Sequence, residues 1–300
     1  MELRHLRYFI AVAEEGSLTV AAERRLHTAQ PSLSRQIRDL EYEVGVDLLV
    51  RSSRGVELTP AGRAFLDHAR LALTQVEAAG EAARRAARPA NASFAMGFLN
   101  GQEMKWLPEA IAILRQELPN MDVIVSSKTS PELSNALVRG QIDVAFLRPD
   151  RQVADLEYRL LTKEPMVVVL PSDHRLAAAK EIDPRDLAGE PFVTVSKTAP
   201  MLRIVIDDYL QRLGLDFVTK VEVDNLSGAI SLIASTRGVA ILPIYAVNFL
   251  PWSVVSRPIA GEAPTIDLAL GYHRANNSPI LRLFLSKADE LIDRVSRQRS

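Results

Sequence analysis

The chain has 300 residues, of which 47% are hydrophobic and 24% charged, with a formal net charge of −1, and this is a globular composition long enough for two or three cores. It has no cysteine and no run of about 18 apolar residues, which excludes disulfides, thiol nucleophiles, cysteine metal sites and transmembrane helices. The five histidines are scattered without metal-ligand spacing, so we expect no cofactor. A cysteine-free chain suits the reducing cytoplasm, where we expect the protein to act.

An amphipathic helix opens the chain. Leu6, Phe9, Ile10 and Ala13 recur at the spacing of one helical face. Gly16 can end this helix in a left-handed conformation. Acidic residues interrupt the apolar stretch, which argues against a signal peptide.

Two further helices follow within the next thirty or so residues. Thr19 is the predicted N-cap of a short helix over VAAERRL. Thr28 is the predicted N-cap of a third helix, with Pro31 tolerated in its first turn. The apolar face of this third helix consists of Leu33, Ile37, Leu40 and Val44.

The opposite face of the third helix carries polar and basic groups. It consists of Pro31, Ser34, Arg35, Arg38 and Tyr42, with Gln30 at the tip. Glutamine can pair with adenine, arginine with guanine and serine with either, while a helix N-terminus attracts phosphate. An ordinary solvated helix face has the same pattern. The use of arginine without lysine in residues 1–88 likewise fits codon bias as well as DNA contact.

The segment RSSRGVELT predicts a β-hairpin with a Ser-Arg-Gly turn, which would carry Arg51 and Arg54. A hairpin that follows such a helix is typical of a wing that contacts the DNA backbone. It therefore favours DNA binding over a solvated helix face.

The stretch AAERRLHTAQPSLSRQIRDLE, followed by LLVR and LTPAG, resembles the DNA-binding domain of LysR-type transcriptional regulators. The resemblance extends without gaps over the first sixty or so residues. It implies a winged helix-turn-helix over residues 1–59. The implied DNA-binding residues are Thr28, Gln30, Pro31, Ser34, Arg35 and Arg38 at the recognition helix, and Arg51 and Arg54 on the wing. Ser52 and Ser53 make this wing less basic than in some members.

A long helix is predicted over residues 60–89, with Thr59 and Pro60 as its N-cap and first-turn pair. Its small and apolar residues recur as in a coiled-coil seam, at Phe65, Ala69, Ala72, Val76, Ala79 and Ala83. Such a helix can lie along its own domain or pair with a second copy. The resemblance implies pairing, a dimer through this helix, a homotetramer, and RNA polymerase as a further partner.

Strands and helices alternate from residue 90 to residue 300, which predicts an α/β effector domain. We expect one lobe over about 92–161 plus 265–300 and a second over about 164–264. The phrases ELSNALVRGQIDVAFL, VVVLPSDHRLA and GVAILP resemble the type 2 periplasmic-binding-protein-like sensor of LysR regulators. That fold implies a ligand between the lobes.

Ligands of open parallel sheets lie at the carboxyl ends of strands and near helix N-termini. This criterion selects Asn100, Gly101, Gln102, Thr129, Ser130, Arg148, Thr198, Met201, Asn225 and Leu226 as effector-binding residues. Two alternatives stay open. Ser130, which precedes Pro131, can simply cap a helix, and Arg148 can pair with Asp143 or Asp150 at the surface.

The sequence thus predicts a DNA-binding transcriptional regulator that a small-molecule effector switches. The phrases IDVAFLRP, EPMVVVLP and RPIAG are most similar to a subgroup that senses aromatic acids and related small carboxylates. An enzyme is disfavoured because Walker, GxGxxG, GxSxG and HExxH motifs are absent. A free solute-binding protein would leave the first ninety or so residues unexplained. A winged-helix repressor with an unrelated dimerisation domain would leave PSDHRLA and GVAILP unexplained.

Overall fold

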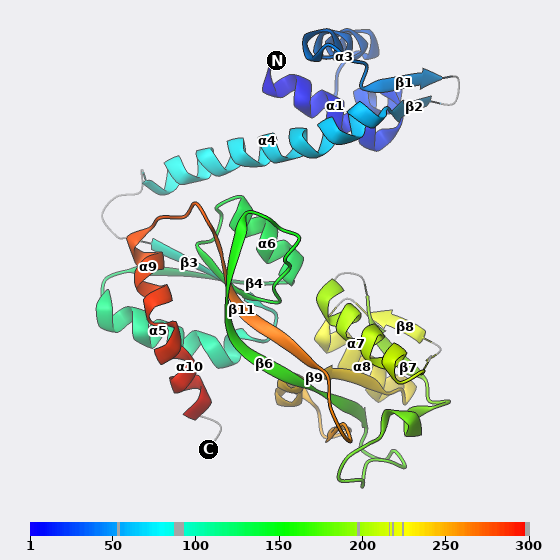
Figure 1. Ribbon diagram of the computed structural model, residues 1–300, viewed down its shortest axis with the longest axis vertical. Helices are drawn as coiled ribbons and strands as arrows, with labels where there is room; N and C mark the ends of the chain where they lie inside the picture. Colours follow the sequence, from blue (N-terminus) through cyan, green and yellow to red (C-terminus); the bar gives the residue numbers. More distant parts are fainter. Residues whose placement is uncertain are drawn as a thin grey trace. The chain divides into compact units, whose positions relative to one another are not determined.

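The computed structural model describes residues 1–52, 55–86, 93–196, 199–215, 217, 219–223 and 225–297. The chain forms two compact units, Met1–Ala86 and Ala87–Ser300, and their elements are labelled in Figure 1. None of the helices in the described ranges combines the length and the hydropathy that a membrane crossing requires.

The N-terminal unit consists of helices and one hairpin (Figure 1). In chain order these are α1 (Leu3–Glu15), α2 (Leu18–Val20), the π-helix η1 (Ala21–Leu26), α3 (Gln30–Val44), β1 (Leu49–Ser52), β2 (Gly55–Leu58) and α4 (Pro60–Ala86). The two strands pair antiparallel. Gly16 ends α1 with φ +61°, as predicted. The two hairpin strands flank the predicted turn, and the long helix begins at Pro60 as predicted. Ser53 and Arg54 of the turn and residues 87–89 of the predicted helix lie outside the described residues.

Two predicted helix caps are wrong. Ser17, not Thr19, caps the second helix, because the Val20 N–H donates to the Ser17 hydroxyl at 3.3 Å and Thr19 lies inside α2. Thr28 does not cap α3. The extended residue Ala29 precedes that helix, and the Thr28 N–H instead donates to the Ala22 carbonyl at 3.0 Å.

The core of the N-terminal unit joins α1 and α3 to the start of α4. Phe9, Leu33, Ile37 and Leu40 are fully buried in it. Thr59 caps α4 as predicted, since its hydroxyl accepts from the Gly62 N–H at 2.8 Å. A side chain at Gly62 would lie 2.0 Å from the Leu48 carbonyl oxygen. Glycine at position 62 therefore lets the start of α4 pack closely against the residues that lead into β1.

The C-terminal unit is built on a seven-stranded sheet of order β10-β6-β11-β5-β3-β4, with β9 also paired to β6. The strands are β3 (Ser93–Leu99), β4 (Asp122–Lys128), β5 (Val144–Leu147), β6 (Leu156–Pro171), β9 (Ala240–Pro243), β10 (Val254–Pro258) and β11 (Thr265–His273). A separate parallel pair consists of β7 (Phe192–Val195) and β8 (Thr219–Val223). The helices are α5 (Glu103–Glu117), α6 (Ser130–Val138), η2 (Pro184–Leu187), α7 (Pro200–Arg212), α8 (Leu226–Thr236), η3 (Ile244–Phe249), α9 (Pro279–Ser286) and α10 (Ala288–Arg297).

Helices cover both faces of the first lobe's sheet. Successive β3 side chains alternate between the two faces: Phe94 and Phe98 join the core that contains α5, α9 and α10, while Ala95 joins the core under α6. The last segment therefore returns to the first lobe. At Gly97 a side chain would lie 2.4 Å from Leu133, so glycine lets α6 approach the strand.

Two long strands connect the lobes. β6 is 16 residues long, and it pairs with β11 up to Pro165 and with β9 and β10 from Met166 onward. The apolar run MVVVL is thus in the second half of a strand that begins in the first lobe. Figure 1 shows β6 running from one lobe into the other, with β11 beside its first half. A strand shared in this way positions the ends of the other strands around a common space.

Candidate functional site

The exposed face of α3 is the first candidate surface. Arg35, Arg38 and Tyr42 project into solvent, with side-chain exposure of 80% for Arg35. On the opposite face Leu33, Ile37 and Leu40 are fully buried and Val44 is half-buried. The Arg35 Nε lies 3.9 Å from Asp39, a loose contact between two exposed groups. Pro31 is exposed and Gln30 half-buried at the start of the helix, with Thr28 just before it. The predicted α3 residues therefore share one accessible face.

Arg51 on β1 contacts α3. Its Nη1 donates to the Ser34 hydroxyl at 3.1 Å, and its Nη2 lies 3.5 Å from the Glu41 carboxylate. Glu41 is nearly buried, and it also accepts from the backbone N–H groups of Leu48 and Leu49 at 3.0 Å each. The wing and the third helix are thus joined by side chains. Arg54 lies outside the described residues.

The exposed part of α4 is a second candidate surface. Phe65 and Ala69 of the predicted seam pack on their own unit, where the Phe65 ring lies 5.2 Å from Phe9 in an edge-to-face contact. The rest of the seam, Ala72, Val76, Ala79 and Ala83, is exposed. The first alternative therefore holds for the first turns, which pack within the chain, whereas the later turns leave a surface of small residues exposed.

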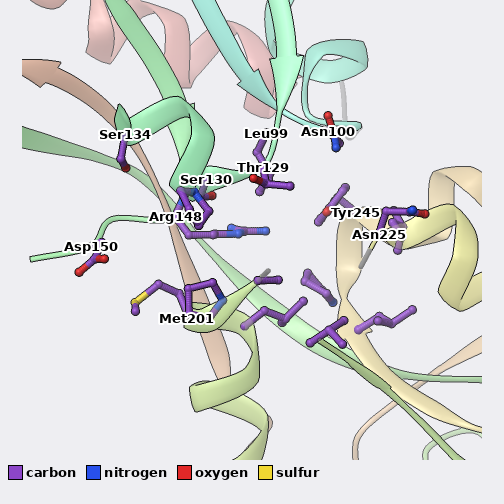
Figure 2. A pocket seen from close by; sticks show the side chains of 18 residues that line it. Leu99, Asn100, Thr129, Ser130, Ser134, Arg148, Asp150, Met201, Asn225 and Tyr245 are labelled. Atoms are coloured by element: carbon purple, nitrogen blue, oxygen red, sulfur yellow. The ribbon is translucent and has the colours of Figure 1, made fainter. Parts of the chain in front are cut away.

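A pocket of about 90 Å³ lies between the lobes of the C-terminal unit (Figure 2). Its apolar lining consists of Leu99, Pro131, Val195, Ala199, Pro200, Met201, Leu202, Leu226, Leu242 and Pro243, and its polar lining of Asn100, Thr129, Ser130, Ser134, Arg148, Asp150, Asn225 and Tyr245. These residues lie at the ends of β3, β5, β7 and β9 and at the starts of α6, α7 and α8. Figure 2 shows Ser130 and Arg148 facing Tyr245 and Asn225 across the space.

Seven of the predicted effector residues line this pocket: Asn100, Thr129, Ser130, Arg148, Met201, Asn225 and Leu226. Gly101 and Gln102 are not among the lining residues. Gly101 has φ +90° and lies against the rings of Phe249 and Tyr245, where a side chain has no room. Gln102 is completely buried behind the pocket. Thr198 lies outside the described residues.

Arg148 is held in a buried polar network. Its Nη2 lies 2.5 Å from the Glu164 carboxylate, and its Nη1 donates to the Asp267 carbonyl at 3.1 Å. Glu164 also accepts from Gln102 at 3.1 Å, and Gln102 accepts from the Trp106 indole at 3.1 Å. Arg148 and Glu164 are 5% and 1% exposed. The alternative that Arg148 pairs with Asp143 or Asp150 at the surface is therefore wrong.

The starts of α6 and α8 meet at the pocket. Thr129, not Ser130, caps α6 in a capping box with Glu132, and the Thr129 hydroxyl and N–H groups hold the pKa of that carboxyl below its usual value. The alternative that Ser130 is simply a cap is therefore wrong. The Ser130 hydroxyl accepts from the Arg148 N–H at 3.0 Å. Asn225 caps α8 by accepting from Gly228 at 2.7 Å.

Tyr245 and Glu164 were not predicted. The Tyr245 ring lies 5.6 Å from the Arg148 guanidinium, and burial raises the pKa of its hydroxyl, so the group is a protonated donor. Tyr245 follows the strand in GVAILP, so the criterion of strand ends would have found it. Glu164 lies in the middle of β6 and carries no such signal. Among the described residues, no group of three or more histidine, aspartate or glutamate side chains could hold a metal ion.

Comparisons with known proteins cover the whole chain. Residues 3–63 match the family model for the bacterial regulatory helix-turn-helix protein, lysR family, and residues 87–291 match the LysR substrate binding domain. The chain is 38% identical to the Hca operon transcriptional activator HcaR of Escherichia coli, over 99% of this chain and 100% of that protein. Among solved structures it resembles full-length BenM (TM-score 0.60, 28% identity, 98% and 97% covered). It also resembles full-length CbnR complexed with the target DNA (TM-score 0.57, 26% identity, 97% and 100% covered).

Proposed function

Since this chain belongs to the LysR family of bacterial transcriptional regulators, which bind promoter DNA and small-molecule effectors and form oligomers, we propose which residues serve each task. Its relative HcaR is a named transcriptional activator, and the chain is a regulator and not an enzyme. We assign DNA contact to the exposed face of α3 and to the wing. The residues concerned are Thr28, Gln30, Pro31, Ser34, Arg35 and Arg38, with Arg54 on the wing. Arg51, the other wing arginine of the prediction, is joined to α3 through Ser34 and Glu41.

We propose that the pocket between the lobes binds a small organic acid with an aromatic or otherwise apolar body. The observation that carries this proposal is the lining itself: apolar side chains surround the starts of two helices, and helix N-termini attract carboxylates. Arg148 is already neutralised by Glu164, so the ligand carboxylate is held mainly by the α6 and α8 starts.

Trp106 provides the direct test of the ligand class. It is buried and hydrogen-bonded to Gln102, whereas the second tryptophan, Trp252, is 92% exposed. In the full-length Trp252→Phe variant we expect saturable changes in Trp106 fluorescence with benzoate, 3-phenylpropionate or cyclohexanecarboxylate. The corresponding neutral amides are the control. Equal responses to acids and amides would mean that the pocket does not recognise a carboxylate, and no response to any acid would refute the ligand class.

Ser130→Val tests where the ligand lies. The substitution removes the hydroxyl from the pocket and leaves the Arg148 N–H without its acceptor, at a cost of about 1–3 kcal/mol in the free energy of unfolding. We expect operator binding to persist and the effector response to vanish. Ser278→Val is a matched control, because Ser278 also precedes a proline at a helix start and does not line the pocket. A normal effector affinity in Ser130→Val would place the ligand elsewhere.

We further propose how binding is transmitted. A ligand that contacts both lobes favours one relative orientation of them, and a coupling of about 1–3 kcal/mol is typical of such switches. The strands β6 and β11 are the connection through which this orientation changes. We propose that the exposed residues Ala72, Val76, Ala79 and Ala83 of α4 form a dimer interface and that the assembly is a homotetramer. We place its action in the cytoplasm, on DNA and with RNA polymerase.

A further inference from the structure

The hydrogen bonds around Ser34 define which groups that serine can contact. A serine hydroxyl has one hydrogen to donate and two lone pairs. One lone pair of Ser34 is occupied by the Arg51 Nη1–H at 3.1 Å. Within residues 1–52 and 55–86, no side chain or carbonyl accepts the Ser34 hydroxyl hydrogen. The guanidinium charge repels that hydrogen, so the O–H bond points away from Arg51.

Arg51 is itself held on both sides. Its second terminal nitrogen lies 3.5 Å from the Glu41 carboxylate, which is only 10% exposed and which also accepts from the N–H groups of Leu48 and Leu49. Glu41 and Ser34 belong to the same helix, seven positions apart, so Arg51 spans about two turns of α3 from the wing strand. A planar guanidinium fork can make both contacts at once, whereas an ammonium group is a single point charge.

We propose that Arg51 acts as a positioning residue that turns Ser34 into a hydrogen-bond donor toward DNA, rather than as a phosphate contact of the wing. Ser34 then reads acceptor groups, namely purine N7, guanine O6, thymine O4 or a phosphate oxygen, through its free hydrogen, and only its second lone pair is left for the amino groups of adenine and cytosine. This proposal rests on the assignment of the α3 face to DNA.

Arg51→Lys separates the two roles because it keeps the positive charge and loses the fork. A phosphate contact would survive this substitution, with little change in affinity and in the dependence on salt. A positioning role would not survive it. We expect Arg51→Lys to lower the ratio of specific to random-duplex affinity by about tenfold while the salt dependence stays within about half a unit of the wild-type slope.

A double-mutant cycle completes the test in the full-length protein. Ser34→Ala alone should lower the same ratio by a similar factor, and Ser34→Ala added to Arg51→Lys should lower it no further. Arg63→Lys is the matched control, because Arg63 donates to the Leu58 carbonyl on the other wing strand and does not touch Ser34. It should behave as the wild type.

The outcomes distinguish this proposal from the DNA-face assignment. If Arg35→Ala weakens specific binding but Arg51→Lys leaves the ratio unchanged, or if the Ser34 and Arg51 effects add independently, the positioning role is refuted and the DNA face stands. If neither Arg35→Ala nor Ser34→Ala affects binding, the DNA face itself is misplaced. Replacing single purines by 7-deazapurines in the operator then identifies the acceptor: loss of the Ser34 effect at one position indicates N7, and no loss at any purine indicates O4, O6 or phosphate.

Discussion

Arg35 on α3 and Arg148 after β5 carry the same side chain in opposite surroundings. Arg35 is 80% exposed and has only a loose contact with Asp39 at 3.9 Å. Arg148 is 5% exposed, with Glu164 at 2.5 Å and the Asp267 carbonyl at 3.1 Å. An exposed charge costs little to keep available for a partner, whereas a buried charge must be matched within the protein. Arg35 in the N-terminal unit thus stays accessible to other molecules, whereas Arg148 in the C-terminal unit is held in the buried network beside the pocket.

The largest expected effect comes from removing the partner of the buried charge. Glu164→Leu leaves the Arg148 guanidinium buried and uncompensated and also takes the acceptor from Gln102. We expect a loss of about 3–5 kcal/mol in the free energy of unfolding of the C-terminal unit. Urea denaturation, followed through the unfolding transition of that unit, measures this loss.

The double variant Arg148→Met/Glu164→Leu sharpens this prediction. Replacing both charges by apolar groups removes the uncompensated ion, so most of the lost stability should return. If the double variant is as unstable as Glu164→Leu, the cost does not come from the unpaired arginine. The contrast between Arg148 and Arg35 would then have another cause.

The next effect concerns the exposed residues of α4 that we propose as a dimer interface. Val76→Glu places a carboxylate among Ala72, Ala79 and Ala83 on α4, where the side chain of Val76 is 41% exposed. The folded chain should tolerate it. A dimer would have to bury an unpaired charge, so we expect affinity for a two-half-site operator to fall about 100-fold or more.

Light scattering and calorimetry separate loss of the dimer from loss of folding in the Val76→Glu variant. The expected outcome is a smaller particle with an unchanged thermal transition of the C-terminal unit. Leu71→Glu is a suitable control, because Leu71 is also exposed on α4 but lies outside the proposed seam. An unchanged mass and operator affinity in Val76→Glu would show that the helix does not pair there.

Substitution of the exposed Arg35 should change the affinity for DNA and not the stability of the fold. Arg35→Ala is expected to weaken specific operator binding by about 1–3 kcal/mol, because it removes a base-edge contact, while the free energy of unfolding changes by less than about 0.5 kcal/mol. Gel shift or anisotropy with operator and random duplexes measures the first quantity. Arg115→Ala, an exposed arginine on α5 in the other unit, controls for the loss of one positive charge. Equal effects of the two substitutions would contradict the assigned face.

The difference between Arg35 and Arg148 also shows which structural features could be predicted from the sequence. The face that carries Arg35 follows from helical periodicity, which needs only neighbouring residues, and the same holds for the Gly16 and Thr59 helix ends. Likewise, strand ends and helix starts sufficed to predict Ser130, Asn225 and Met201 in the pocket lining. Local sequence patterns therefore predict on which face or at which end of a helix or strand a side chain lies.

The partner of Arg148 could not be predicted in that way. Glu164 is its partner only because β6 lies beside β11, and β11 beside β5, and this strand order joins segments that are more than a hundred residues apart in sequence. The continuity of β6 through both lobes was missed for the same reason, since a shared strand has no boundary signal of its own. The misplaced cap at Thr19 has a smaller cause: Ser17 and Thr19 both carry hydroxyls, and the choice depends on which residue leaves the helix.

The smallest expected effect is on the pH dependence of stability. It comes from an ion pair that joins α1 to α4. The Glu14 carboxylate lies 2.6 Å from Arg70 on α4 and also contacts Arg25. The hydrogen bond from Arg70, followed by that from Arg25, lowers the pKa of the Glu14 carboxyl below its usual value. Because the pKa of Glu14 is lower in the folded state than in the unfolded state, its ionised carboxylate stabilises the folded protein. This stabilisation is complete when the pH is above the unfolded-state pKa, and it is lost as the pH falls through the folded-state pKa. Since Glu14 and Arg70 are 30% and 49% exposed, solvent screening limits this contribution to about 0–1 kcal/mol.

Arg70→Gln should therefore destabilise the N-terminal unit slightly at pH 7 and flatten the decline in its thermal midpoint between about pH 5 and the folded-state pKa of Glu14, as linkage requires. Differential scanning calorimetry of the full-length protein at closely spaced pH values measures both effects. Glu14→Gln should give the same flattening, because it removes the titrating group itself. If the decline below pH 5 is as steep in both variants as in the wild type, other carboxylates cause it and the Glu14–Arg70 pair behaves as a fully screened surface contact.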